Sequence, residues 1–197
     1  MVEISRRRAI EDVASDLFRA HGYAGTSVRD IARALSLQGA SLYAHVTSKE
    51  DVLWGIVDRA ATRFEAAADD AERDAEGRRP GDPVEAIVAL ICAHVEVLTA
   101  DVGEASVFVS EWRSLGPERR AAVLDRRDAY EGRFRRRISE GIAIGAFALV
   151  DPAIASTVLL TALNGVATWF DPAGRLPAGR VADNLVDLSL RMLEAQT

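Results

Sequence analysis

TSVRDIARALSLQGASLYAHVTSKE, residues 26–50, predicts two short helices separated by a tight turn and followed by the start of a third helix. Ser27 and Asp30 have the spacing of a capping box, which also places a carboxylate at the electropositive end of its helix. Apolar residues then recur at intervals of three and four, which predicts one inward helix face: Val28, Ile31, Ala32 and Leu35. Ser36 ends this pattern.

The flanking residues complete a small helical unit. Leu42 and Val46 give the second short helix an inward face, and Ser48 has capping spacing to Asp51 at the start of the third helix. Two short helices bury little apolar surface alone, so they need a supporting helix. We expect it at residues 5–21, with an apolar side of Ile10, Val13, Ala14, Leu17 and Phe18 and an end at His21-Gly22-Tyr23. Three small helices that include a helix-turn-helix are typical of a DNA-reading unit.

Residues 10–57 resemble the N-terminal domain of the tetracycline-repressor (TetR) family of bacterial regulators. The resemblance is carried by LF at 17–18, GY at 22–23, TSVRDIA at 26–32, SLY at 41–43, His45 and SKE at 48–50. It covers about the first third of the chain and combines caps, core positions and exposed polar residues in one order. The resemblance implies an all-α protein that binds DNA and carries a larger C-terminal ligand-binding and dimerisation domain.

The sequence departs from the family pattern at four positions. Ser36 stands where the family usually has glycine in the turn, Gln38 where it usually has serine, and Gly39-Ala40 replaces a common basic-glycine pair. These changes leave the fold intact but alter the base-reading surface, so no operator sequence can be transferred. They also motivate an alternative function, a helical dimeric adaptor or sensor that has lost specific DNA binding.

The composition is that of an ordinary soluble globular protein. The chain has 197 residues, 49% of them hydrophobic and 27% charged, which is ordinary for a globular protein able to bury a core. The single cysteine, Cys92, excludes an internal disulfide, and no signal peptide is recognisable, so we expect a cytoplasmic protein. Residues 1–60 have no net charge, and the remaining residues carry the whole net charge of −6. This charge disfavours extensive non-specific binding to nucleic acid.

The remaining sequence predicts only helices, about nine in the whole chain. We place a DNA-binding domain at residues 1–50 and a ligand-binding and dimerisation domain at 51–197. Helices are expected at about 48–71, 82–98, 104–113, 117–144, 152–170 and 181–193, with a linker at 77–83. The arginine-rich stretch at 133–137 reads as a solvated helix surface because its cations spread over several faces and acids lie nearby.

Residues 152–170 contain no charge and are long enough to span a membrane. We reject that interpretation because the stretch is rich in small residues, contains Asn164, and has Asp151 and Asp171 at its ends. A helix that is apolar all round also fits between its own core and a partner subunit. With the final helix it forms a hairpin that two copies can pair into a four-helix interface, as the last two helices do in the TetR family.

The predicted DNA contacts lie in and beside the helix-turn-helix. Tyr43 and Lys49 are expected to bind phosphate, since matching residues hold the DNA backbone in the family. Thr26 and Ser27 can add hydroxyl and backbone amide hydrogen bonds to phosphate at a helix N-terminus. His45 matches a family position near phosphate, with an ordinary surface histidine as the alternative. For Tyr43 the alternative is packing against the core. We expect Gln38, Ser41 and Arg29 to contact the edges of the bases. Gly39 would allow the backbone to approach the DNA closely. A homodimer would place two recognition helices about one DNA turn apart, so the operator should be an inverted repeat.

The C-terminal region is expected to hold a small hydrophobic effector. Residues 111–120, 126–141 and 163–176 resemble a TetR branch that answers to acyl-coenzyme A thioesters, with a free hydrophobic acid or another small molecule as the alternative. Arg113, Arg127 and Arg133 are candidate phosphate ligands because a guanidinium binds phosphate bidentately. The predicted effector-binding residues are Phe108, Trp112, Arg113, Arg127, Phe134, Asn164, Thr168 and Trp169. For each aromatic residue, core packing is the competing interpretation.

Enzymatic activity is not indicated. The three histidines, His21, His45 and His94, are scattered and lack metal-ligand spacing with a carboxylate or with Cys92. The sequence has no glycine-rich phosphate loop and no nucleophile elbow. We therefore predict no cofactor and no catalytic residues, with operator DNA, a small effector and a second copy of the chain as partners and with no membrane association.

Overall fold

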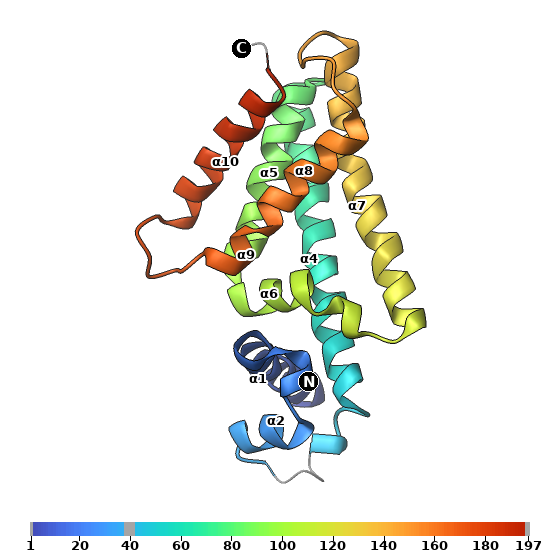
Figure 1. Cartoon of the computed structure of the whole chain (residues 1–197), viewed down its shortest axis with the longest axis vertical. Coiled ribbons are helices and arrows are strands. Elements are labelled where there is room, and N and C mark those ends of the chain that lie inside the picture. The colour runs from blue at the N-terminus through green and yellow to red at the C-terminus, as the bar shows by residue number, and fades with distance from the viewer. Residues whose placement is uncertain (1, 38–41, 196–197) are drawn as a thin grey trace. The chain divides into compact units, whose positions relative to one another are not determined.

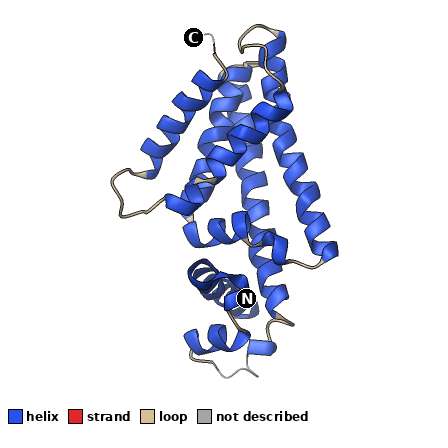
Figure 2. Ribbon diagram, viewed as in Figure 1, coloured by secondary structure: helices blue, strands red, loops and turns tan. Residues whose placement is uncertain are grey.

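A computed structural model describes residues 2–37 and 42–195, and all regular structure in these residues is helical (Figures 1 and 2). The all-α prediction is confirmed. Its longer helices are α1 (Val2–Gly25), α4 (Lys49–Arg78), α5 (Pro83–Ala100), α7 (Pro117–Ala143), α8 (Pro152–Asn164) and α10 (Ala178–Met192). Shorter ones are α2 (Val28–Ala34), α6 (Val102–Ser110), α9 (Val166–Trp169) and the 3₁₀ turn η1 (Trp112–Ser114).

The chain forms two compact units. The first contains residues 1–62 and 101–125, and the second contains residues 63–100 and 126–197. α4 and α7 each contribute residues to both units. The family resemblance instead placed a domain boundary after residue 50, and that boundary stays a prediction.

The supporting helix of the first unit bends where the sequence predicted its end. Gly22 has φ 73° and ψ 159°, outside the helical range, and helical residues continue beyond it to Gly25. A positive φ is open to glycine without the steric cost that a Cβ brings. Upstream, α1 packs against α2 and α6 and buries Ile10, Ala14 and Phe18, which forms much of the core of this unit.

The two predicted caps are confirmed. Ser27 caps α2, with its hydroxyl accepting from the Asp30 amide at 3.2 Å while Asp30 Oδ2 accepts from the Ser27 amide at 2.9 Å. The Asp51 amide donates to Ser48 Oγ at 3.0 Å at the start of α4. Both arrangements satisfy amides that an isolated helix end leaves without partners.

Several helix boundaries differ from the sequence-based expectations. α4 continues to Arg78 rather than ending near residue 71, because residues 72–76 favour helix and the first proline, Pro80, comes only two residues after its end. The apolar stretch at 152–170 is two helices, α8 and α9, separated at Gly165, instead of one. α6 begins at Val102, two residues before the predicted start, because Asp101 caps it through the Glu104 amide.

In the second unit α5 is the most enclosed helix. It packs against α8, α9 and α10 (Figure 1). Its inner side includes Ile87, Leu90 and Ile91, each fully buried. Two helical stretches, Pro83–Ala100 and Pro152–Trp169, have the length and composition of a membrane span, with 50% and 39% of each buried inside the protein. α5 and α8 pack on each other, so part of their apolar composition is explained by the core of this unit.

Candidate nucleic-acid interface and effector site

The helix-turn-helix is held by a hydrogen-bonded turn after α2. The Leu37 amide donates to Ala32 O at 2.8 Å and the Ser36 amide to Arg33 O at 3.0 Å, the pattern of a Schellman motif. Ser36 occupies the left-handed position of this motif, with φ 56°. The serine that replaces the usual family glycine therefore adopts the conformation that glycine favours, and the turn keeps its geometry.

The exposed groups of the predicted DNA surface lie on and after α2. Arg29 is exposed, and the side chain of Tyr43 is 56% exposed. His45 is half-buried, and its Nδ1 atom is buried without a hydrogen-bond partner in the described part of the chain. Leu42 and Val46 are buried, as their assignment to the core requires. The predicted base contacts Gln38, Gly39 and Ser41 lie outside the described residues.

Lys49 connects the start of α4 to the turn that precedes α2. Its ammonium donates to Tyr23 O at 2.8 Å and to Thr26 O at 2.9 Å, and it lies 4.1 Å from the centre of the Tyr23 ring. An ammonium has three N–H donors, so these two bonds leave one for another acceptor. Lys49 therefore has a structural role in addition to its predicted phosphate contact.

The hydroxyl groups of Thr26 and Ser27 are also used within the protein. Thr26 is buried, and its hydroxyl donates to Gly22 O at 3.0 Å. The Ser27 hydroxyl donates to Asp30 Oδ2 at 2.6 Å, and this bond is the main reason that the pKa of Asp30 lies below its usual value. Both residues shape the helix end, and the contribution of either to DNA binding stays a prediction.

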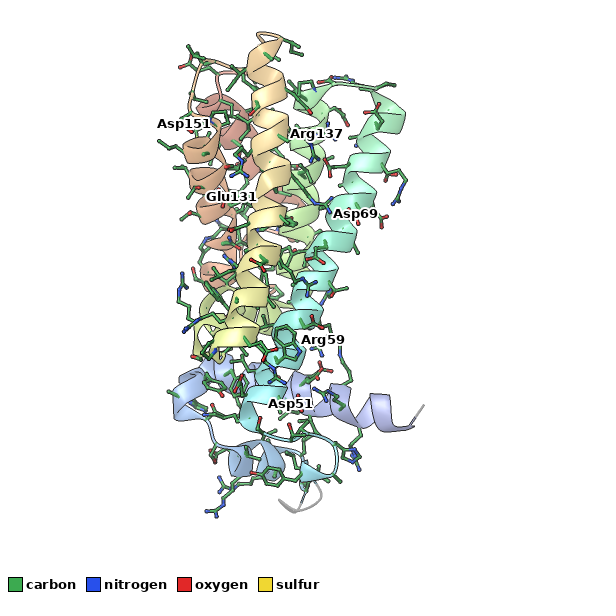
Figure 3. The ribbon with its side chains drawn as sticks, turned by 90° about the vertical axis from the view of Figure 1, so that its right-hand side faces the viewer. Asp51, Arg59, Asp69, Glu131, Arg137 and Asp151 are labelled. Atoms are coloured by element: carbon green, nitrogen blue, oxygen red, sulfur yellow. The ribbon has the colours of Figure 1, made fainter. Side chains whose placement is uncertain are left out.

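A buried ionic network joins α1, α4 and α6 in the first unit. Arg59 of α4 contacts Glu104 of α6 at 2.5 Å and Glu11 of α1, and the two carboxylate side chains are only 2% and 8% exposed (Figure 3). Glu11 approaches α4 closely because position 55 is glycine, where a Cβ would overlap its carboxylate. The network fixes the supporting helix of the DNA-binding head to α6.

The predicted effector-binding residues divide between the two units. Phe108 and Trp112 are buried in the first unit, and the Arg113 guanidinium lies 4.5 Å from the centre of the Trp112 ring. In the second unit, Phe134 is fully buried, Asn164 and Arg127 are half-buried, and Thr168 and Trp169 are exposed. The Thr168 hydroxyl donates to Gly165 O at 2.7 Å.

The structure reveals a polar pair that the sequence analysis missed. His94 of α5 is buried, and its Nδ1 lies 3.0 Å from the Tyr130 hydroxyl of α7. Rings of Phe64, Tyr130 and Phe134 surround the imidazole, with centroid separations of 4.8, 5.7 and 6.4 Å. Burial lowers the pKa of His94 to about 3, an effect that Asn164 opposes and Arg127 reinforces. Thus three predicted residues, Arg127, Phe134 and Asn164, do gather around one buried polar group.

The arginine-rich stretch of α7 forms ion pairs with α4. Arg133, Arg136 and Arg137 contact the Glu72 carboxylate at 2.8–2.9 Å, and Arg133 also contacts Asp69 at 2.6 Å. Figure 3 labels Arg137 and Asp69 on the two helices. Arg133, which we considered as a phosphate ligand, is therefore already paired with two carboxylates.

Large apolar side chains are exposed on each of the last three helices of the second unit, and we refer to them together as the exposed apolar face. The side chains concerned are Ile154 and Val158 of α8, Trp169 of α9, and Leu188 and Met192 of α10, between 40% and 65% exposed. Several large apolar side chains exposed to solvent on successive helices are typical of a surface that binds another protein.

These features define a helix-turn-helix DNA-binding protein with a further helical unit. The family sequence model described as "Bacterial regulatory proteins, tetR family" matches residues 10–54, and "Tetracyclin repressor-like, C-terminal domain" matches residues 80–193. The chain belongs to the TetR family of bacterial transcriptional regulators.

Individual relatives extend over nearly the whole chain. The repressor KstR2 of Mycobacterium tuberculosis is 24% identical, over 94% of this chain and 92% of that protein. The crystal structure of PfmR from Thermus thermophilus superposes with a TM-score of 0.81 at 35% identity, covering 92% of this chain and 97% of that one. AibR in complex with isovaleryl coenzyme A and operator DNA gives a TM-score of 0.81 at 28% identity, with 93% and 97% covered.

Proposed function

We propose that this protein is a ligand-responsive transcriptional repressor that binds an inverted-repeat operator as a homodimer. The observation that carries the proposal is the geometry of α2 and of the turn after it: α2 is capped, the turn has Schellman geometry, and Tyr43 is exposed beyond the turn. An exposed phenol donates well to a phosphate oxygen. Since Ser36 adopts the conformation of the glycine that it replaces, the turn gives no support to the alternative of an adaptor without DNA binding.

Dimerisation through the last helices is supported by the exposed apolar face of α8, α9 and α10. Two copies related by a two-fold axis bury the same face on both sides, so one self-complementary patch suffices. α8 and α10 both pack on α5, so the face rests on a well-buried core. A dimer of this kind gives the two helix-turn-helix units that an inverted repeat requires.

The effector is proposed to be a small hydrophobic molecule, with an acyl-coenzyme A thioester as the leading class. AibR, which is 28% identical to this chain, has been crystallised with isovaleryl coenzyme A and operator DNA. The aromatic surroundings of His94 offer an apolar site with few polar groups, which is typical of small-molecule pockets. The protein would act in the cytoplasm, where its operator is accessible.

The test is an electrophoretic mobility shift with DNA upstream of the gene for this protein and of its neighbours. We expect a retarded complex that weakens steeply as salt rises, because phosphate contacts release counterions. Tyr43→Ala should weaken binding, and Tyr43→Phe should reproduce the part of that loss due to the hydroxyl. Leu124→Ala, an exposed apolar change on α7, is the matched control. If wild type and Tyr43→Ala bind these fragments equally, the assignment of Tyr43 is wrong; if no genomic DNA is bound, the repressor proposal is wrong.

A further inference from the structure

Only one of the two ring nitrogens of His94 has a hydrogen-bond partner of ordinary geometry in the described part of the chain. Nδ1 is paired with the Tyr130 hydroxyl, but Nε2 is buried without a hydrogen-bond partner anywhere in residues 2–37 and 42–195. The residue is almost fully buried, with a relative exposure of 3%. A buried polar atom without a partner costs roughly 1–3 kcal/mol, so such atoms are rare in native proteins and need an explanation.

The Tyr130 hydroxyl determines which kind of partner Nε2 needs. The Tyr130 hydroxyl and His94 Nδ1 lie 3.0 Å apart, and the tautomer of the imidazole decides which of them donates. In the arrangement considered for effector binding, the phenol donates its proton to Nδ1. When Nδ1 accepts that proton, a neutral imidazole carries its own hydrogen on Nε2. The pKa of His94 is lowered to about 3, mainly by burial, so the ring stays neutral at physiological pH. In this tautomer Nε2 is an N–H donor, and the Asn164 side chain is the polar group whose hydrogen bond raises the pKa of His94 against the effect of burial.

The surroundings favour an uncharged acceptor. The rings of Phe64 and Phe134 lie beside the imidazole, and Tyr130 is half-buried, with its pKa raised by desolvation. Burying a carboxylate requires a compensating charge, whereas a carbonyl oxygen requires only a hydrogen bond. The cation that influences His94 is Arg127, which is half-buried and has interactions of its own.

The amide of Asn164 supplies a second polar group from α8. A hydrogen bond from its side chain opposes the lowering of the pKa of His94, although Nε2 has no partner within the ordinary limits of hydrogen-bond length and angle. Tyr130 also lines a surface hollow of about 420 Å³ together with Glu65, Arg126 and Arg133. The Tyr130 side chain thus contacts His94 and also borders this hollow.

We propose that His94 Nε2 is the donor that binds the carbonyl oxygen of an uncharged effector group, with Asn164 as its polar neighbour and Tyr130 as the residue that fixes the tautomer. The effector class is therefore a thioester, ester or ketone carried on an apolar chain, rather than a free carboxylate. This inference rests on the proposed function, in that it names the chemistry by which the effector is recognised.

Isothermal titration calorimetry with probes that have or lack a carbonyl oxygen tests whether His94 Nε2 binds that oxygen. Isovaleryl coenzyme A and octanoyl coenzyme A are compared with the corresponding thioethers, which lack the carbonyl oxygen, with the free acids, and with 2-octanone. Wild type should bind a carbonyl probe about 10- to 100-fold more tightly than its carbonyl-free analogue, the range of one buried hydrogen bond. In His94→Phe this difference should disappear, while thioether binding is unchanged.

Two further variants separate recognition from packing. In His94→Phe/Tyr130→Phe both hydrogen-bonding partners are replaced by rings of similar shape, so the apo protein should keep or raise its melting temperature while the carbonyl preference is lost. Tyr130→Phe alone should reduce the preference only partly, because the donor remains but its tautomer is no longer fixed. A purely structural His94 would instead give a lower melting temperature in the double variant.

The proposal is overturned if no carbonyl probe binds wild type, if free acids bind more tightly than thioesters and ketones, or if His94→Phe retains the preference. The mobility shift of the apo variants is measured in parallel. If wild type shows no preference for carbonyl probes but still binds its operator, only this inference is wrong. If wild type does not bind operator DNA, the proposed function is wrong.

Discussion

Ser36 has a left-handed backbone in the turn between the two helices of the DNA-binding motif, with φ 56°. A Cβ in this conformation costs roughly 1 kcal/mol relative to glycine. We therefore predict that Ser36→Gly raises the free energy of unfolding by about 0.5–1 kcal/mol, measured by urea denaturation. The turn hydrogen bonds of Ser36 and Leu37 use backbone atoms only, so they survive the change.

Ala34→Gly is the matched control, two residues earlier at the exposed end of α2. Its backbone is helical, so glycine there should lower stability by about 0.5–1 kcal/mol. Opposite signs at the two positions are the expected result. Destabilisation by both substitutions would contradict the left-handed turn.

His94 makes stability depend on pH in a defined direction. Its pKa is lowered to about 3 in the folded protein, while an unfolded histidine has a pKa near 6.5. Between these values the unfolded chain binds the proton and the folded protein does not. The contribution of His94 is therefore fully present above pH 6.5 and is lost as pH falls towards 3.

Between pH 7 and pH 5 wild type should lose about 2 kcal/mol more stability than His94→Phe, measured by denaturant titration at both values. The groups that face the imidazole are Tyr130, Asn164 and Arg127, and none of them titrates in this window. Carboxylates elsewhere titrate equally in both proteins and cancel in the comparison. Equal losses would mean that His94 is accessible to solvent protons in the native state.

Residue patterns with local partners were predictable, and those with distant partners were not. Ser27 and Asp30 are three positions apart, so the sequence alone reveals the capping box that the structure contains. Lys49 bonds carbonyls 23 and 26 positions away, and His94 meets Tyr130 across 36 positions. A single sequence carries no signal for such pairs, because any buried histidine fits an apolar helix face equally well.

At the scale of the elements, the Arg59 network predicts how α1, α4 and α6 stabilise one another. Arg59→Met would leave Glu11 and Glu104 buried without their main cation. Breaking a buried ion pair in this way typically costs about 3–5 kcal/mol. We expect a loss of at least about 3 kcal/mol in the free energy of unfolding, measured by thermal or urea denaturation.

Arg73→Met is the control on the same helix. The Arg73 side chain is 70% exposed and pairs only with exposed acids, so its removal should change stability by less than about 0.5 kcal/mol. If Arg59→Met were as harmless as Arg73→Met, the network would not hold α1 against α4 and α6.

Helix existence was easier to predict than helix length. The helix predicted at residues 117–144 appears as α7, Pro117–Ala143, because Pro117 begins it and Gly145 closes it with φ 74°. α4 runs past its expected end because the acidic, alanine-rich sequence after residue 71 loses its apolar stripe without losing its helix propensity. Hydrophobic periodicity depends on large apolar residues, and beyond residue 71 the buried contact of α4 is made by an alanine, Ala75, so the pattern does not indicate this part of the helix.

At the scale of the whole molecule, the apolar face of α8, α9 and α10 should be the dimer contact. Trp169→Glu places a charge on an exposed ring that we expect the partner to cover, and burial of an unpaired charge is strongly unfavourable. The variant should be monomeric at micromolar concentration by light scattering, with its helix content retained.

Leu124→Glu provides the comparison, because it adds the same charge at an exposed apolar position of α7. It should remain dimeric. A monomeric wild type, or a Trp169→Glu variant that stays dimeric, would exclude this face as the contact.

DNA footprinting of the bound operator tests the central claim most directly, that two copies of this helix-turn-helix read one symmetric site. Wild type should protect two half-sites of an inverted repeat, with centres about one helical turn apart, at two protomers per site. Tyr43→Ala should lose both protected half-sites together. Protection of a single half-site by one protomer, or no sequence-specific protection at any concentration, would contradict the account.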